Sequence, residues 1–335
     1  MSKRMDVKVE EIGLTASFEP LVSVCMVTYN HERFITQAVE SVMMQETDFP
    51  IELVVGEDCS TDNTREILLE LQKRYSDRIR LLLPERNLGP HKNFRSNIKA
   101  SRGKYVAFMD GDDFWTDPLK LAKQVALMET EAAVRICFHP VSIVDETGMP
   151  SGRLYPISSH RRIRGGLKDL LDSIACHSAI PTGSVVMLRA VIPEVPENFD
   201  KLLIGDCPYW VMALGSGIVA CIDEPMTAYR QHDGGIWSSK TQETQFEAEL
   251  EFWRAIAPYI PKGLRGIGWG RMRDCCEKWF SMVPSASRMK MLRIAFSWIT
   301  VSLQLGKWNG AQFRYFIGRI FPMLPKLFRR GTNTP

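Results

Sequence analysis

The feature that most constrains the fold is an alternation of short apolar runs with segments of helical spacing. Residues 22–28 read VSVCMVT, a compact apolar run typical of a strand that is covered on both faces. Strands that alternate with helices favour a mainly parallel sheet flanked by helices. The predicted strands are residues 22–28, 51–55, 79–83 and 104–109, and the predicted helices are residues 31–45, 60–71, 93–100 and 119–128.

The rest of the chain is less regular. Residues 135–144 and 183–188 are predicted as strands and residues 205–214 as a helix, whereas the signals past Gln242 are helical. We therefore expect a boundary near residues 241–245, between an α/β region and a helical appendage.

Charge is distributed unevenly along the chain. The net charge is +3, but from Lys278 to Pro335 there are ten cations and no Asp or Glu, so +3 less 10 leaves −7 for the preceding residues. Such asymmetry predicts an anionic partner for the tail. Five apolar residues of the tail recur at helical spacing, with most cations off that stripe, as in helices that lie in a membrane interface. They are Phe313, Phe316, Ile317, Ile320 and Leu324.

We expect that partner to be an anionic membrane surface. A nucleic acid would need the same charges, but the many aliphatic residues disfavour it. A helical appendage packed on the rest of the protein is the alternative. No apolar run reaches the roughly 18 to 20 residues of a spanning helix. Because the start lacks the apolar core of a signal peptide and the eight cysteines form no C-x-x-C pair, a cytoplasmic protein on the inner face of the cell membrane is expected.

Polar clusters follow three of the predicted strands. They are residues 28–30 (Thr-Tyr-Asn), residues 57–58 (Glu-Asp) and residues 110–113 (Asp-Gly-Asp-Asp). Ligands of parallel α/β sheets bind beyond the carboxyl ends of the strands, so these clusters should meet at one edge. Their convergence predicts a site.

The most informative cluster is residues 110–113, which contain three carboxylates. Carboxylates held together are costly unless a cation neutralises them, and oxygen ligands suit Mg²⁺ or Mn²⁺. Gly111 would permit a tight turn or close approach of a ligand. A solvated turn that caps the next helix is the alternative, and Asp113 or Asp117 fits that role.

Other nucleotide-binding classes fit less well. Asp58 lies where a dinucleotide-binding domain places its ribose-binding acid, but the first strand-to-helix turn reads TYNHER, without the glycines that pyrophosphate approach requires. A Walker A sequence and a G-x-S-x-G elbow are also absent from the sequence.

Several ordered motifs resemble those of the family 2 glycosyltransferases, which have a GT-A-type, Rossmann-like fold. They are VSVCMVTYNHERFITQAVESVMMQ, GEDCSTDNT, NLGPHKNF, GKYVAFMDGDDFWTDPLKLAKQ and YRQHDGGIWS. The likeness covers roughly residues 21–239 and is closest to the bacterial branch that builds surface polysaccharides. It implies a catalytic domain (21–241, with donor half about 21–130 and acceptor half about 131–241). Outside the likeness we expect an N-terminal extension (residues 1–20) and the helical basic region (242–335).

The resemblance also implies roles for single residues. Asp112 would hold the metal, Mn²⁺ or Mg²⁺, with His232 as a further candidate ligand, and Asp206 would be the catalytic base. The donor nucleotide would be bound by Thr28, Tyr29, Asn30, Asp58, Lys92, Arg95, Asp110 and Gly111. Without the resemblance, a helix cap is the simpler interpretation of Asp206 and a surface loop that of His232.

Two departures from the family pattern stand out. Many relatives carry Glu-Asp where this chain has Gly205-Asp206, and Ala-Arg-Asn where it has residues 93–95, so either Lys92 or Arg95 is the candidate phosphate contact. The five other histidines show no ligand spacing and are interpreted as structural or surface residues. Trp115 and Trp237 are candidates for stacking on sugar or base, with core packing as the alternative.

The expected activity is inverting transfer of a sugar from a nucleotide diphosphate, UDP favoured, to a hydroxyl of a lipid-linked or surface-polysaccharide acceptor. Two rivals remain open. A sugar nucleotidyltransferase would need a glycine-rich basic loop after the first strand. An inactive glycan- or membrane-binding module would have no use for both Asp112 and Asp206.

Overall fold

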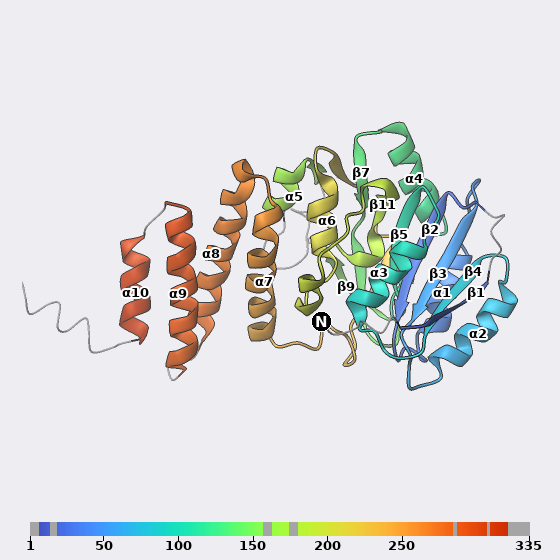
Figure 1. The fold of residues 1–335 in the computed structure, drawn as a ribbon, viewed down its shortest axis with the longest axis horizontal. Coiled ribbons are helices and arrows are strands. Elements are labelled where there is room, and N and C mark those ends of the chain that lie inside the picture. Colours follow the sequence, from blue (N-terminus) through green and yellow to red (C-terminus); the bar gives the residue numbers. More distant parts are fainter. Residues whose placement is uncertain are drawn as a thin grey trace, which may run out of the picture. The chain divides into compact units, whose positions relative to one another are not determined.

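The computed structural model describes residues 7–13, 19–156, 163–173, 180–283, 287–306 and 309–320. The chain divides into two compact units. The sheet unit holds the described residues up to Ser239, apart from Leu202–Ile204, and the helical unit consists mainly of the residues from Lys240 onward. Figure 1 shows both units.

A nine-stranded sheet in the order β1-β4-β3-β2-β5-β11-β7-β12-β10 forms the centre of the sheet unit. Four neighbouring strands are parallel, and all four fall on predicted runs. They are β4 (Ile79–Pro84), β3 (Ile51–Glu57), β2 (Val22–Thr28) and β5 (Tyr105–Asp110). Their side chains are almost all buried, as expected for continuous apolar runs with cover on both faces.

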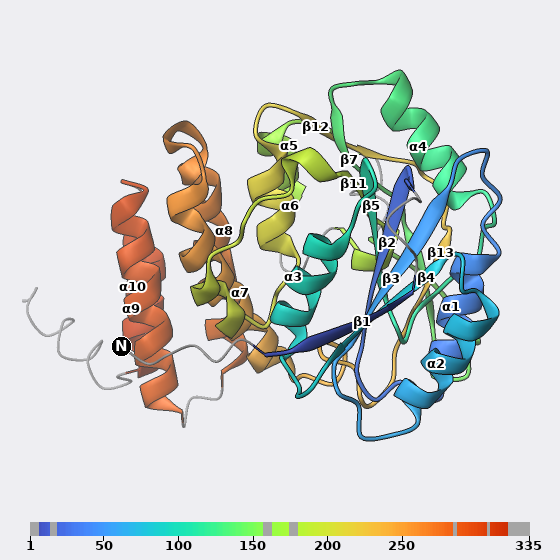
Figure 2. The ribbon, with the colours of Figure 1, turned by 45° about the vertical axis from the view of Figure 1, so that its right-hand side comes forward.

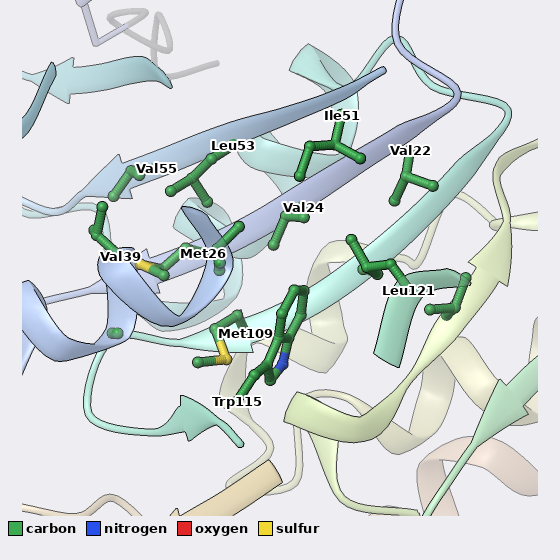
Figure 3. Close-up of a cluster of buried hydrophobic side chains, with 14 of the residues drawn as sticks. Val22, Val24, Met26, Val39, Ile51, Leu53, Val55, Met109, Trp115 and Leu121 are labelled. Atoms are coloured by element: carbon green, nitrogen blue, oxygen red, sulfur yellow. The ribbon is translucent and has the colours of Figure 1, made fainter. Parts of the chain in front are cut away.

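Helices cover both faces of these strands (Figure 2). The predicted helices α1 (Ile35–Met43), α2 (Thr64–Arg74) and α4 (Lys120–Thr130) bury apolar residues in the main core on one face, part of which Figure 3 shows. On the other face, α3 (Pro90–Ala100) and α6 (Cys207–Leu214) lay aromatic rings on Phe108 of β5. The expected α/β layering is confirmed.

The single strand predicted over residues 135–144 is wrong. The segment forms β7 (Val134–Phe138) in the large sheet and β8 (Val141–Val144) in a second sheet of order β6-β13-β8-β9. The change of sheet falls at His139 and Pro140, and Pro140 has no N–H for a continuing ladder. Residues 183–188 likewise form only a three-residue strand, β11 (Val186–Leu188), after a 3₁₀ turn at Thr182–Ser184.

Short strands and helices complete the sheet unit, and pairing beyond β5 is mixed, since β11 lies antiparallel to both β5 and β7. The remaining elements are β6 (Phe114–Trp115), β9 (Pro150–Tyr155), β10 (Arg164–Gly165), α5 (Leu167–Ser173), β12 (Ile218–Cys221) and β13 (Thr227–Arg230). The expected N-terminal extension contributes β1 (Val9–Gly13), an unpredicted edge strand antiparallel to β4.

The helical unit consists of α7 (Gln242–Ile256), α8 (Arg265–Met282), α9 (Arg288–Gln304) and α10 (Gly310–Ile320). Phe316, from the predicted apolar stripe of the tail, is buried against Phe280 and Trp298, and Ile320 is buried too. These two residues therefore face the interior of the unit, whereas Leu324 lies outside the described residues. Of the helices that the structure describes, none has the length and apolar character to span a bilayer.

Candidate active site

Three predicted polar clusters lie at the same edge of the sheet because their strands are in register. Thr28, the last residue of β2, pairs with Glu57 of β3, and Val27 pairs with Asp110 of β5. The polar residues after each strand therefore emerge side by side. The convergence predicted from the sequence is present in the fold.

Gly111 makes the acidic turn (residues 110–113) pack closely on β2. Its N–H donates to the carbonyl of Val27 at 2.9 Å. A Cβ at this position would lie 2.6 Å from Oγ1 of Thr28 and 3.0 Å from Nδ1 of His31. The sequence predicts a glycine that permits close approach, and here the approaching groups belong to the chain itself.

Asp112 contacts two imidazoles. Its Oδ2 lies 3.0 Å from Nε2 of His232 and 3.8 Å from Nε2 of His31. Burial would raise the pKa of Asp112, but the hydrogen bond to His232 and the nearby His31 bring it below its ordinary value. His31 was predicted to be structural or surface, and this interpretation is incomplete because the turn after β2 directs its ring to Asp112.

His31 is oriented by a second contact, since its Nδ1 lies 3.1 Å from Oγ1 of Thr28. Burial lowers the pKa of His31 despite the neighbouring Asp112. The available signal in the sequence was its position three residues beyond a strand end, rather than any ligand spacing.

Arg230 of β13 holds the acidic turn in place, a role that the sequence did not predict. Its backbone N–H donates to Oδ1 of Asp113 at 2.8 Å, and its Nε donates to the carbonyl of Asp112 at 2.8 Å. The guanidinium lies over the rings of Phe34 and Phe114. Asp113 is buried and bonds to β13, so it is not the solvated helix cap that was considered as the alternative for it.

Asp110 lies in a strongly acidic environment. Burial, together with the charges of Asp112 and Asp206, raises the pKa of Asp110 to about 8. Burial and the charges of the acidic turn, Asp113 first, also raise the pKa of the Tyr229 hydroxyl, with a smaller effect from Asp206. The carboxylates of the acidic turn and of Asp206, which are far apart in sequence, therefore lie within electrostatic reach of one another.

Asp206 precedes α6 and caps it. Its Oδ1 accepts a hydrogen bond from the N–H of Cys207 at 2.7 Å, and its Oδ2 accepts one from the hydroxyl of Thr182 at 2.6 Å. Burial raises the pKa of Asp206, which these hydrogen bonds and His91 partly offset. A raised pKa makes a carboxylate a stronger base, so the cap and the predicted base are compatible roles.

The missing carboxylate at Gly205 has a steric reason. A Cβ on Gly205 would lie 2.4 Å from Cε1 and 2.7 Å from Nδ1 of His91. The imidazole at the start of α3 therefore occupies the space that a side chain at residue 205 would enter. This places a second histidine, also predicted to be structural or surface, beside the site.

The predicted nucleotide-binding residues border the same edge. Tyr29 is 42% exposed at the end of β2, available for stacking. Asn30 has a positive φ of 57°, and its Oδ1 accepts a bond from the N–H of Thr61. Both carboxylate oxygens of Asp58 accept bonds from the N–H groups of Leu88 and Gly89, so Asp58 anchors that loop.

The two candidate phosphate contacts differ in their surroundings. Arg95 pairs with Asp200 through Nη2 and Oδ2 at 2.6 Å, whereas Lys92 is exposed. Trp115 is 1% exposed, and its Nε1 donates to the carbonyl of Gly183, so it packs in the core and is not available for stacking. Trp237 is half-buried.

The residues present suit a divalent cation. Within the described ranges, no three His, Cys, Asp or Glu side chains form a ready ligand set. Asp112 and His232 nevertheless bring an oxygen and a nitrogen donor to one point, and the raised pKa of Asp110 indicates clustered acid without a compensating charge. Magnesium-like ions bind through one or two carboxylates and take substrate phosphate oxygens at further positions.

Comparison with known proteins identifies the class. The Glycosyl transferase family 2 profile matches residues 23–192. An uncharacterized glycosyltransferase of Nostoc is 36% identical over 267 residues, which are 76% of this chain and 78% of the relative. This chain belongs to glycosyltransferase family 2.

Other relatives are more distant or longer. An uncharacterized protein of Mycobacterium tuberculosis is 35% identical over 65% of this chain, which spans only 61% of that relative's length. The Escherichia coli protein WfaP, named as a UDP-Glc:alpha-D-GlcNAc-diphosphoundecaprenol beta-1,3-glucosyltransferase, is 28% identical over 67% of this chain and 82% of its own.

Solved structures share the fold. TarS of S. aureus (residues 1–349), in complex with UDP-GlcNAc, superposes with a TM-score of 0.58 at 19% identity and covers 86% of this chain and 93% of its own. A mannosyltransferase of Pyrobaculum calidifontis, in complex with GDP-Man and Mn²⁺, has a TM-score of 0.52 at 12% identity, with 93% of this chain and 89% of its own covered.

Proposed function

We propose that this chain is an inverting, metal-dependent glycosyltransferase that moves a sugar from a nucleotide diphosphate to an acceptor hydroxyl. One observation carries the proposal. Asp112 and Asp206 both lie near enough to Asp110 for their charges to raise its pKa. A metal-ligand candidate and a base candidate thus flank one point at the sheet edge, where ligands of α/β sheets bind.

Departure of a nucleoside diphosphate places negative charge on its phosphate oxygens. A bound Mn²⁺ or Mg²⁺, held by Asp112 and His232, would supply charge neutralisation for this leaving group. The chain itself orients Asp112, since Arg230 fixes the backbone of the acidic turn and His31 contacts the carboxylate oxygen that faces His232. Exposed Lys92, rather than Arg95 with its Asp200 partner, is the favoured phosphate contact.

Asp206 is the proposed base. An acceptor hydroxyl is a poor nucleophile, and a positioned carboxylate that takes its proton makes attack on the sugar feasible. Direct displacement inverts the anomeric carbon and needs only this one base. The raised pKa of Asp206 favours proton uptake.

The relatives guide the choice of substrates. WfaP is named for a UDP-sugar and a lipid diphosphate acceptor, and TarS has been solved with UDP-GlcNAc. A UDP-sugar donor and a lipid-linked or surface-polysaccharide acceptor are therefore proposed. Tyr29 and Asn30 would line the base pocket, with residues 21–130 as the donor half and 131–241 as the acceptor half.

A nucleotide-release assay tests this function. Purified protein is incubated with a panel of UDP- and GDP-sugars and acceptors, with and without Mn²⁺. Asp112→Asn should abolish the Mn²⁺-dependent release, and Asp206→Asn should lower transfer about 100-fold or more while UDP binding persists. Transfer by both variants at the wild-type rate would refute the proposed roles.

We further propose that the helical unit associates with an anionic membrane surface on the cytoplasmic face. Support comes from α9, where Met289, Phe296 and Leu303 recur on one face and are 79%, 72% and 67% exposed. The excess of cations adds attraction of about 1 kcal/mol for each one near the headgroups. Two of them, Lys290 and Arg293, already pair with Glu243 and Glu247, which reduces this contribution.

Sedimentation with vesicles tests the membrane proposal. The full chain should sediment with vesicles of phosphatidylcholine and phosphatidylserine, and Phe296→Ser with Leu303→Ser should release it. Met149→Ser, at an equally exposed residue of the sheet unit, is the matched control. Equal sedimentation with pure phosphatidylcholine, or no effect of the α9 substitutions, would contradict the proposal.

A further inference from the structure

Both oxygens of Asp206 are held by the chain, and the two donors come from different places. The N–H of Cys207 is an ordinary helix cap from the next residue. The hydroxyl of Thr182 comes from a 3₁₀ turn 24 positions earlier and lies 2.6 Å from Oδ2. The cap of α6 does not require the bond from Thr182, so this bond must be explained by its effect on the Asp206 carboxylate.

The turn that carries Thr182 is fixed by buried groups. The carbonyl of Gly183 accepts bonds from Nε1 of Trp115 at 3.0 Å and from the hydroxyl of Thr227 at 3.1 Å. The carbonyl of Ser184 accepts one from Nε2 of Gln124 at 2.9 Å. All three donors are buried, so Thr182 sits on a rigid support although its own side chain is only half-buried.

We propose that Thr182 is a positioning residue for the catalytic base, because its hydroxyl fixes the plane of the Asp206 carboxylate toward the acceptor. The inference deepens the proposed glycosyl transfer and rests on it. With one donor on each oxygen, rotation about the Cβ–Cγ bond of Asp206 breaks one hydrogen bond or the other. Each oxygen keeps a further lone pair with which to accept a proton.

The support also joins the two halves of the site. Trp115 lies two residues after the acidic turn, and it donates to the Gly183 carbonyl next to Thr182. Thr227 precedes Arg230, the residue that holds the acidic turn, in the same strand. The elements that position Asp112 therefore also set the position of Asp206, and small displacements of a base are costly to catalysis.

Substitution of Thr182 tests the role. Thr182→Val keeps the shape and removes the donor, so kcat should fall about 10- to 100-fold while KM for the donor stays the same. Thr182→Ser keeps the hydroxyl and should restore kcat to within a few-fold of wild type. Thr130→Val, which removes a threonine hydroxyl bonded to the Ala126 carbonyl at the end of α4, is the control and should match wild type.

Three results would overturn the inference: wild-type kcat in Thr182→Val, an increase in donor KM in place of the kcat loss, or no rescue by serine. If the valine variant fails to fold, Thr182→Ala removes the same donor and the same criteria apply. Asp206→Asn separates the two proposals. If it transfers sugar normally, the proposed base fails, and if it is inactive while Thr182→Val is normal, only the positioning role fails. Once Asp206→Asn is present, adding Thr182→Val should cause no further loss.

Discussion

Two buried glutamates, one in each unit, have pKa values that are shifted in opposite directions. Glu52 of β3 is fully buried and bonds to Ser23 and to the guanidinium groups of Arg80 and Arg102. Burial would raise the pKa of Glu52, but these partners bring it below its ordinary value. Glu249 of α7 is 3% exposed, and burial raises its pKa to about 7. Depth of burial alone therefore does not decide whether a carboxylate is charged.

The contrast between Glu52 and Glu249 helps to explain the raised pKa of Asp110 in the acidic turn. Asp110 resembles Glu249 more than Glu52, because burial and like charges raise its pKa and no cationic side chain offsets them. The sheet unit thus compensates Glu52 with arginines and leaves Asp110 without such a charge. Under the proposed function, a bound divalent ion would supply the missing positive charge.

The largest effect should follow from removal of the charged partner of two arginines. Glu52→Ala leaves half-buried Arg102 without its carboxylate and buried Arg80 with only Glu11, and should lower the free energy of unfolding by about 3–5 kcal/mol. Urea denaturation measures the change. Glu70→Ala, exposed on α2, is the control and should alter stability by about 0.5 kcal/mol or less. A loss of stability in Glu52→Ala no larger than in Glu70→Ala would contradict the view that the arginines make Glu52 a stabilising buried charge.

The helical unit should lose stability as pH rises. Folded Glu249 keeps its proton up to about pH 7, whereas the unfolded side chain releases it near 4.5, so the folded state binds more protons between these values. The contribution of Glu249 to stability is therefore fully present below pH 4.5 and is lost as pH rises to 7, by on the order of 3 kcal/mol. Glu249→Gln should flatten the dependence in urea titrations at pH 5 and 8, and exposed Glu251→Gln should retain it.

A divalent ion should stabilise the sheet unit. At a concentration 100 times the dissociation constant, Mn²⁺ with UDP would add about 2.7 kcal/mol to the free energy of unfolding, and the thermal midpoint would rise. Asp112→Asn should abolish the rise, because it removes the charge of the proposed ligand. An equal rise in this variant would show that the ion binds elsewhere.

The smallest effect should come from the support of Thr182. Trp115→Phe keeps a ring in the core but removes the Nε1 donor to Gly183, at a cost of about 1 kcal/mol in stability. Transfer should decline in the same direction as in Thr182→Val, by less. A loss of stability without any change in kcat would show that the Trp115 hydrogen bond stabilises the core but does not position Asp206.

The sequence predicted the parallel half of the fold because its strands are continuous apolar runs bounded by polar residues. The mixed half was not predictable in this way. His139 and Pro140 move one apolar segment between sheets, and β6 has only two residues. Clustered acids revealed Asp112, and the family resemblance added Asp206. Arg230 and Thr182 act through contacts between distant positions, 118 residues apart for Arg230 and Asp112, which leave no local pattern. For His31, the only local signal was its position three residues beyond a strand end.

The edge strand β1 has a consequence for association between molecules. It pairs with β4 along its whole length and presents mostly exposed residues, including Glu10 and Glu11, at the border of the sheet. Without it, β4 would offer a row of unpaired N–H and C=O groups on a strongly apolar strand, a template for pairing with another chain. Glu11 also binds the guanidinium of Arg80, so the cover is tied to the buried charge network beneath it. Loss of these few residues would replace an edge strand that carries exposed glutamates with the apolar edge of β4, and would favour association with another chain.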